Sequence, residues 1–304
     1  MTTATTGAPT PATLGRMIVP LLGLAIFINY VDRGNLATAA PLMKDELALT
    51  ATQFGILVSA FFWTYTPGQV LAGWLGEKLN PYRTLAIGLA VWAIATALTG
   101  LATGFAAILI LRLLLGLGET AAFPCSSKII AQHVPPEKLG GANAIVSLGL
   151  SIGPAFGTLA GGLLMASVGW RPAFILFGLA SLLWLVPWIL ATRRLSASAE
   201  HDVSADTAPP FAPILARPAL WGASLGHFRV NYGFSFVVSW LPIYLVKVQG
   251  FSMSLMAWVG AAVYLSYAAG ALLGGHLTDR WIAAGATPNR ARKTLMVVCH
   301  AAAP

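Results

Sequence analysis

Apolar stretches of about 20 residues, the length that crosses a bilayer as an α-helix, recur along the whole chain. Lipid offers no hydrogen-bond partner to backbone N–H and C=O groups, so such segments span a membrane as helices. Charged residues make up only 9% of the 304 residues, whereas a soluble domain carries about 25%. The sequence therefore predicts an all-α integral membrane protein, with helices near residues 17–38, 52–75, 84–104, 105–131, 140–166, 171–191, 218–246 and 254–276.

The basic residues are distributed unevenly between the two sides of the membrane. If the N-terminus is cytoplasmic, twelve of the 18 Lys and Arg residues fall on cytoplasmic segments, three fall outside and three lie inside expected helices. This positive-inside bias predicts a multi-pass protein of the cell's inner membrane with a cytoplasmic N-terminus. The net charge of +8 therefore reflects topology, and we expect no nucleic-acid partner.

Cysteine and histidine are too sparse and scattered for a metal site. Cys125 and Cys299 stand alone in apolar segments, and the five histidines form no ligand spacing. We therefore expect no disulfide, metal or cofactor. A membrane enzyme would need a nucleophile–base or metal constellation near one face, and the sequence shows none, so we do not expect an enzyme.

An internal repeat relates the two parts of the chain. A shift of 202 residues superimposes Asn29-Tyr30 on Asn231-Tyr232, Tyr65 on Tyr267, Gly68 on Gly270, and Gly73, Leu75, Glu77 and Lys78 on Gly275, Leu277, Asp279 and Arg280. Two parallel six-helix halves joined by a linker are a known transporter plan. We expect a disordered cytoplasmic tail (1–15), a six-helix domain (16–191), a cytoplasmic linker (192–216) and part of a second domain (217–304).

The second half is shorter than the first. By the repeat, a complete second half would end at about residue 400, whereas the chain ends at Pro304. We therefore expect a C-terminally truncated chain with about two and a half helices of the second domain. Such a chain would not transport by itself.

The segment from Gly73 to Arg83, Gly-Trp-Leu-Gly-Glu-Lys-Leu-Asn-Pro-Tyr-Arg, resembles the loop signature between helices 2 and 3 of the major facilitator superfamily. The second copy, Gly275 to Arg280, matches its beginning, and Asn80 stands where the family usually has glycine. The resemblance implies a major facilitator fold. It also implies a charged turn that holds the cytoplasmic side shut, with the gating residues Gly73, Glu77, Lys78, Arg83, Asp279 and Arg280.

Three further segments resemble the anion:cation symporter family of that superfamily. They run from Asn29 to Asn35, from Arg112 to Pro124 and from Asn231 to Leu245. The resemblance implies a monomeric secondary carrier in the lipid bilayer. Its partners would be protons and a small organic anion, above all a sugar acid such as a hexonate, hexuronate or aldarate.

Four ionisable residues, Asp32, Arg33, Arg112 and Glu119, lie inside otherwise apolar helices. Each costs several kcal/mol in a membrane unless it faces a wet cavity or a partner, so a functional site is favoured over a purely structural ion pair. Arg112 and Glu119 are seven residues apart and share a helix face, about 10 Å apart along the axis. We therefore expect each to reach a partner on another helix.

These residues suit proton–anion symport. An arriving substrate carboxylate competes for an arginine with a protein carboxylate and makes protonation of that acid easier. Our hypothesis is that Arg33 receives the substrate carboxylate by a bidentate contact, while Asp32 and Glu119 carry protons. The expected substrate-binding set is Arg33, Asn29, Tyr30, Tyr65, Arg112, Asn231 and Tyr232.

Two alternatives stay open. Arg229 is an extra intramembrane cation, and two arginines, one from each half, would fit a phosphate or organophosphate exchanger. The repeat mate of Arg33 is however Ser235, and Arg229 lies six residues earlier. The second alternative is a remnant that does not transport.

Overall fold

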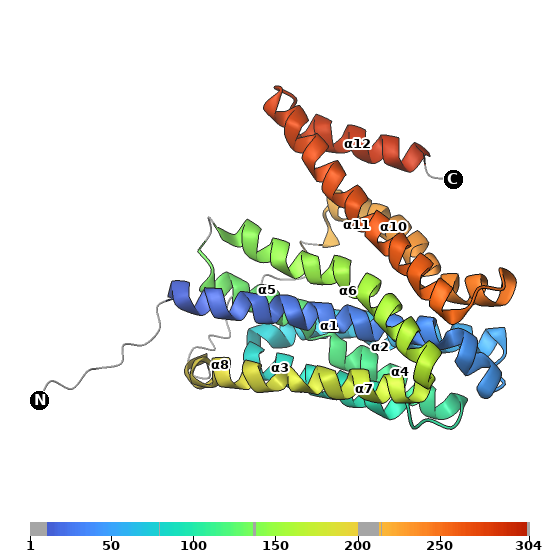
Figure 1. Ribbon diagram of the computed structural model, residues 1–304. Coiled ribbons are helices and arrows are strands. Elements are labelled where there is room, and N and C mark those ends of the chain that lie inside the picture. Colours follow the sequence, from blue (N-terminus) through green and yellow to red (C-terminus); the bar gives the residue numbers. More distant parts are fainter. Residues whose placement is uncertain (1–10, 79, 136–137, 200–212, 214, 303–304) are drawn as a thin grey trace, which may run out of the picture.

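The computed structural model describes residues 11–78, 80–135, 138–199, 213 and 215–302, and this part is helical throughout apart from short connections (Figure 1). The prediction of an all-α protein is confirmed for these residues. The helices are α1 (Pro11–Glu46), α2 (Ala51–Lys78), α3 (Pro81–Thr99), α4 (Phe105–Glu119), α5 (Ala122–His133), α6 (Leu139–Val168), α7 (Trp170–Leu183), α8 (Leu185–Ala199), α10 (Pro218–Ile243), the π-helix η2 (Tyr244–Val248), α11 (Met253–Ala283) and α12 (Pro288–Ala302).

Six helical segments of the described chain are long and apolar enough to cross a membrane. They are Met17–Glu46, Pro81–Thr99, Phe105–His133, Leu139–Val168, Trp170–Arg193 and Met253–Ala283. The pairs α4/α5 and α7/α8 therefore each form one span. α2 and α10 are not among the six, since both carry mid-helix polar residues such as Gln69 and Asn231.

Two helices extend past the expected boundaries. α1 begins at Pro11, so residues 11–15 of the expected tail are helical, while residues 1–10 lie outside the described part. Proline suits the first helical position because it has no N–H to leave unpaired there. α8 continues to Ala199, eight residues into the expected linker, through a segment rich in the helix formers Ala, Arg and Leu. Residues 200–212 of that linker are not described.

Close helix contacts hold the first half together. A methyl group at Gly149 of α6 would lie 2.5 Å from the carbonyl oxygen of Gly23 on α1, and one at Gly153 would lie 2.9 Å from that of Phe27. Because only hydrogen fits there, α1 and α6 approach along their backbones. This contact fixes α1, the helix that carries Asp32 and Arg33.

The second part of the chain leans against the first at one end. A methyl group at Gly162 of α6 would lie 2.6 Å from the Cβ of Ala257 on α11, and one at Gly260 would lie 2.7 Å from a Thr158 methyl. In Figure 1, α11 leaves α6 from this contact at an angle, and α12 lies at its far end. The two parts therefore meet at one end of the bundle.

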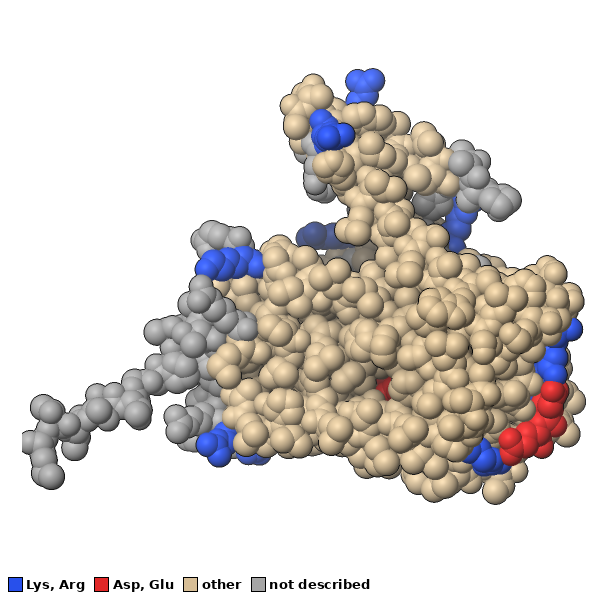
Figure 2. All heavy atoms as spheres, viewed as in Figure 1, with Lys and Arg blue, Asp and Glu red and all other residues tan. Residues whose placement is uncertain are grey.

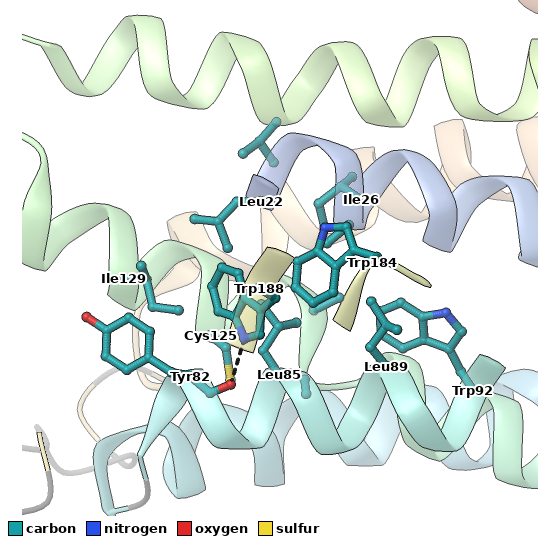
Figure 3. Packing of buried hydrophobic residues seen from close by; sticks show 14 of the residues in the cluster. Leu22, Ile26, Tyr82, Leu85, Leu89, Trp92, Cys125, Ile129, Trp184 and Trp188 are labelled. Atoms are coloured by element: carbon teal, nitrogen blue, oxygen red, sulfur yellow. Dashed lines mark hydrogen bonds between the residues drawn. The ribbon is translucent and has the colours of Figure 1, made fainter. Parts of the chain in front are cut away.

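The core of the first half is aromatic and aliphatic (Figure 3). Leu85 and Trp92 of α3 are fully buried with Trp188 and its neighbour Trp184, whose rings stack at 4.8 Å. The Trp188 Nε1–H donates to the carbonyl oxygen of Tyr82 at 3.1 Å, the dashed line of Figure 3. Both tryptophans are thus packing residues.

The outer surface is suited to lipid. Figure 2 shows long uncharged stretches over the helices, with the coloured charged side chains gathered mainly at the ends of the molecule. Large apolar residues such as Leu176 and Leu183 are 52% and 70% exposed. An exposed apolar belt of this kind is stable only where the surrounding solvent is itself apolar.

Candidate functional site: a cavity beside a buried ion pair

A cavity of about 780 Å³ lies between the first half and the described part of the second. Its lining comes from α1, α2, α4, α5, α6, α10 and α11: Tyr30, Arg33, Gly34, Leu36, Ala37, Val58, Phe61, Phe62, Tyr65, Thr66, Arg112, Phe123, Leu150, Ser151, Pro154, Asn231, Phe234, Ser235, Val238, Ser239, Tyr264 and Tyr267. Among the described residues, the charged members of this lining are Arg33 and Arg112, and no carboxylate belongs to it. An anion is the complementary ligand.

Arg33 forms a buried ion pair with Glu119. Its Nη2 and Nε donate to Glu119 Oε2 at 2.7 and 3.1 Å, and Nη2 also donates to Asn29 Oδ1 at 3.1 Å. The Glu119 side chain has no exposed surface, whereas that of Arg33 is 17% exposed and lines the cavity. Glu119 Oε1 has no hydrogen-bond partner among the described residues. The ion pair thereby joins α4 to α1, and its arginine, but not its carboxylate, lines the cavity.

Aromatic rings surround the Arg33 guanidinium. Its Cζ lies 4.5 Å from the ring centre of Tyr65, 4.7 Å from that of Tyr30 and 4.9 Å from that of Phe61. Cations are attracted to the negative faces of such rings. Tyr30 and Tyr65, two expected substrate-binding residues, thus lie beside Arg33 in the cavity wall.

Arg112 lies in the same wall without a carboxylate partner among the described residues. Its Nε donates to the carbonyl oxygen of Leu57 on α2 at 3.2 Å. Its Cζ lies 5.1 Å from the ring centre of Phe61, the ring that Arg33 also contacts. Arg112 and Glu119 therefore each reach a different neighbouring helix, as their spacing predicts.

Asp32 lies on another side of α1 from its neighbour Arg33. The Ser181 hydroxyl of α7 donates to Asp32 Oδ2 at 2.9 Å, and Asn35 Nδ2 donates to Oδ1 at 3.4 Å. Asp32 is only 2% exposed and is absent from the cavity lining. Successive residues of a helix are about 100° apart, so Asp32 faces α7 while Arg33 faces Glu119. The two expected proton carriers, Asp32 and Glu119, are therefore not brought into one site.

The second half contributes neutral polar groups to the cavity. Asn231 lines it, whereas Tyr232 is 68% exposed on the outside of α10 and is absent from the lining. The structure therefore does not bring Tyr232 to the site, since the next residue on a helix faces elsewhere. The lining also contains polar residues outside the expected substrate-binding set: Thr66, Ser151, Ser235, Ser239, Tyr264 and Tyr267. The feature that marks these residues in the sequence is a hydroxyl group in the middle of an apolar helix.

The expected gating turn is only partly described. The side chains of Glu77, Lys78 and Asp279 and the surroundings of Gly73 lie outside the described part, while Arg83 and Arg280 are exposed. Asn80 caps α3, because its Oδ1 accepts the backbone N–H groups of Tyr82 and Arg83 at 3.1 and 3.2 Å. Asn80 thus satisfies two backbone N–H groups that have no partner within the helix.

The opposite end of the bundle carries an ion pair between the two halves. The ammonium of Lys247, in η2, pairs with the carboxylate of Asp45 near the end of α1. Glu46 accepts from Arg171 Nε at 2.7 Å and from Trp170 Nε1 at 2.5 Å. The Lys247–Asp45 pair thus joins the two halves at the end where α6 and α11 also pack, while the Glu46 contacts lie within the first half.

Comparison with known proteins agrees with this geometry. The family model of the Major Facilitator Superfamily matches residues 22–303. The chain is similar to a probable sulfoacetate transporter of Cupriavidus necator (31% identity over 87% of the chain and 65% of that protein), the hexuronate transporter of Bacillus subtilis (28%, 86% and 64%) and a probable L-galactonate transporter of Escherichia coli (28%, 93% and 66%). It therefore spans about two thirds of the length of these relatives.

Solved structures show the same fold. A bacterial homologue of the human lysosomal transporter Spinster, inward-facing and unoccupied, superimposes with a TM-score of 0.74 at 23% identity, over 88% of the chain and 63% of that protein. A D-xylose–proton symporter gives a TM-score of 0.65 at 16% identity, over 88% and 70%. The relatives named above are transporters rather than enzymes, and they agree with the resemblance to the anion:cation symporters. The chain belongs to the Major Facilitator Superfamily.

Proposed function

We propose that the protein is a secondary active transporter that carries an organic anion, a sugar acid, together with protons. The observation that carries the proposal is the buried Arg33–Glu119 ion pair at the wall of a cavity lined by two arginines. A buried charge is costly unless it is paired. Whatever takes Arg33 away from Glu119 must therefore be accompanied by a change in the charge of Glu119.

Substrate binding supplies such an exchange. The edge of Arg33 that holds Nε and Nη2 is occupied by Glu119, so a substrate carboxylate gains a bidentate contact there by displacing it. Glu119, without a cation and fully buried, is then stable in its protonated form. Substrate and proton therefore bind together. Binding of either one alone would leave a buried charge without a partner, which is costly.

The rest of the lining suits a polyhydroxylated anion. Hydroxyl and amide groups of Ser151, Asn231, Ser235 and Tyr264 line the cavity, and each offers hydrogen bonds to substrate hydroxyls. The similarity to hexuronate and galactonate transporters supports the same substrate class. Asp32 is proposed as a second proton site, since a lone carboxylate inside a membrane helix is costly.

The remaining expectations belong to the same proposal. The N-terminus is cytoplasmic, the carrier is a monomer of the inner membrane, and the turn from Gly73 to Arg83 with Asp279 and Arg280 closes the cytoplasmic side. The positive-inside bias of the sequence supports this orientation.

The proposal is tested by uptake of radiolabelled galacturonate into vesicles that hold the protein isolated from its native membrane. We expect accumulation above equilibrium when the outside is acidified, and its collapse to equilibrium when a protonophore is added. Uptake that is indifferent to the proton gradient would contradict the symport.

A phosphate or organophosphate exchanger is the second candidate, favoured by Arg112, a cavity arginine with no carboxylate partner among the described residues. Arg229, which suggested this function in the sequence, is exposed and absent from the lining. Vesicles preloaded with phosphate separate the two functions. Phosphate-dependent counterflow without proton movement supports the exchanger, and absence of transport under both conditions supports a remnant.

A further inference from the structure

Phe61 occupies an unusual position, because one aromatic ring contacts both arginines of the cavity. Its ring centre lies 4.9 Å from Cζ of Arg33 and 5.1 Å from Cζ of Arg112. The side chain is fully buried from outer solvent and borders the cavity. Tyr65 stacks against the same ring with centres 4.9 Å apart and planes at 24°.

The backbone that carries Phe61 is fixed against α4. A methyl group at Gly116 would lie 2.3 Å from the Phe61 carbonyl oxygen, so the two helices touch at this point. The hydroxyl of Thr64 donates to the carbonyl of Leu113 at 2.8 Å, and Arg112 Nε donates back to that of Leu57 at 3.2 Å. The ring is therefore carried by a segment of α2 that is packed and hydrogen-bonded against α4, the helix of Arg112.

An aromatic ring can stabilise the two guanidinium groups without neutralising them, whereas a carboxylate cannot. Two guanidinium groups in one cavity repel each other, and burial adds to the cost of each. A second carboxylate would remove the repulsion, but it would also neutralise Arg112 and compete with an incoming anion. The face of a ring attracts cations without carrying charge, so Phe61 contacts both arginines without neutralising either of them.

We propose that Phe61 is a positioning residue that holds Arg33 and Arg112 at a fixed separation for one anion. The inference rests on the proposed function for its effect on substrate affinity. Its structural part, the restraint of the two guanidinium groups, stands without a substrate. The two parts therefore have separate measurements.

Three variants separate this role from simple filling of space. Phe61→Leu removes the ring, and Phe61→Tyr keeps it. Phe123→Leu removes a ring from the same cavity lining, where Phe123 contacts Tyr30 edge-on at 6.3 Å. Monodisperse elution and a thermal midpoint near that of the wild type establish that each variant is folded before it is compared.

The substrate-free measurement is the rate at which methylglyoxal modifies Arg33 and Arg112, followed by peptide mass spectrometry. We expect Phe61→Leu to increase the rate at Arg112 about fivefold, since the guanidinium loses its cation–π contact. Phe61→Tyr and Phe123→Leu should stay within about twofold of the wild type. Equal rates in Phe61→Leu and wild type, or an equal rise in Phe123→Leu, would overturn the proposal.

The second measurement is galacturonate uptake by the same variants. Phe61→Leu should raise KM about fivefold to tenfold with Vmax changed less than about twofold, and Phe61→Tyr should restore KM. A lower Vmax at unchanged KM would show a merely structural role and overturn the effect on affinity. If no variant and no wild-type protein takes up galacturonate, the proposed transport fails, while the modification rates still decide whether Phe61 restrains the arginines.

Discussion

Two neighbouring charged residues of α1, Asp32 and Arg33, have different surroundings on the two sides of the helix. On the cavity side, Arg33 is paired with the fully buried Glu119 and lies among aromatic rings. On the side of α7, Asp32 is held by the neutral donors Ser181 and Asn35, and no ion pair is formed with it among the described residues.

The two sides differ in whether a substrate anion could replace the protein carboxylate at a cation. Another carboxylate can compete for an arginine that is paired with a carboxylate, so we expect the Arg33–Glu119 pair to respond to an anion in the cavity. A carboxylate held by a hydroxyl and an amide offers no cation to a substrate. We therefore propose that substrate and proton are coupled through Glu119, and that Asp32, the second proposed proton site, does not contact the substrate.

Glu119→Gln should have the largest effect. The amide keeps the shape of the side chain but neither carries nor exchanges a proton. We expect accumulation of galacturonate against its gradient to be abolished, while exchange of external for internal galacturonate continues. Both are measured with the same vesicle preparation. Loss of exchange as well, in a folded variant, would break the assignment of Glu119 to coupling alone.

Arg33→Lys comes next. Lysine keeps the charge but loses the planar fork that holds a carboxylate by two hydrogen bonds, so KM should rise about tenfold or more. The matched control is Arg229→Lys, whose side chain is exposed and lies outside the cavity lining. An equal rise in KM for Arg229→Lys would place the anion site elsewhere.

Asp32→Asn should change transport differently. Because Asp32 is absent from the cavity lining, KM should stay within about twofold. The accumulation ratio should fall without reaching equilibrium, since one of two proposed proton sites is lost. The measurement is steady-state accumulation at a fixed pH gradient. A KM rise as large as that of Arg33→Lys would remove the distinction between the two sides of α1.

Ser181→Ala should have the smallest effect. It removes the 2.9 Å hydrogen bond to Asp32 and should lower the free energy of unfolding by about 1–3 kcal/mol, because a buried acceptor loses a donor. Ser167→Ala is the control, since the Ser167 hydroxyl bonds to its own helix and is exposed. Thermal unfolding in detergent compares the two. No difference between them would show that Ser181 does not stabilise Asp32.

Part of the site's geometry follows from the sequence. Charges inside apolar helices are costly wherever the helix packs, so the sequence predicts that Arg33, Arg112, Glu119 and Asp32 each face a cavity or a partner, and the structure places Arg33 and Arg112 in the cavity wall with Glu119 paired to Arg33. The repeat fixed the position of Tyr232 along its helix but not the side on which it lies, because tertiary packing orients a helix. Phe61 was missed since a phenylalanine in a membrane helix carries no polar signal. The start of α1 at Pro11 was missed because a polar, Thr-rich segment resembles a flexible tail.

The central claim is that an anion takes the place of Glu119 on Arg33 and that Glu119 then binds a proton. It is tested most directly by adding galacturonate to the purified protein in weakly buffered detergent solution and recording proton uptake with a pH indicator, with binding followed in parallel by calorimetry. The wild type should take up about one proton per anion bound through Glu119, and Glu119→Gln should bind galacturonate without that uptake. Binding to the wild type without proton uptake, or the same uptake by Glu119→Gln, would contradict the claim.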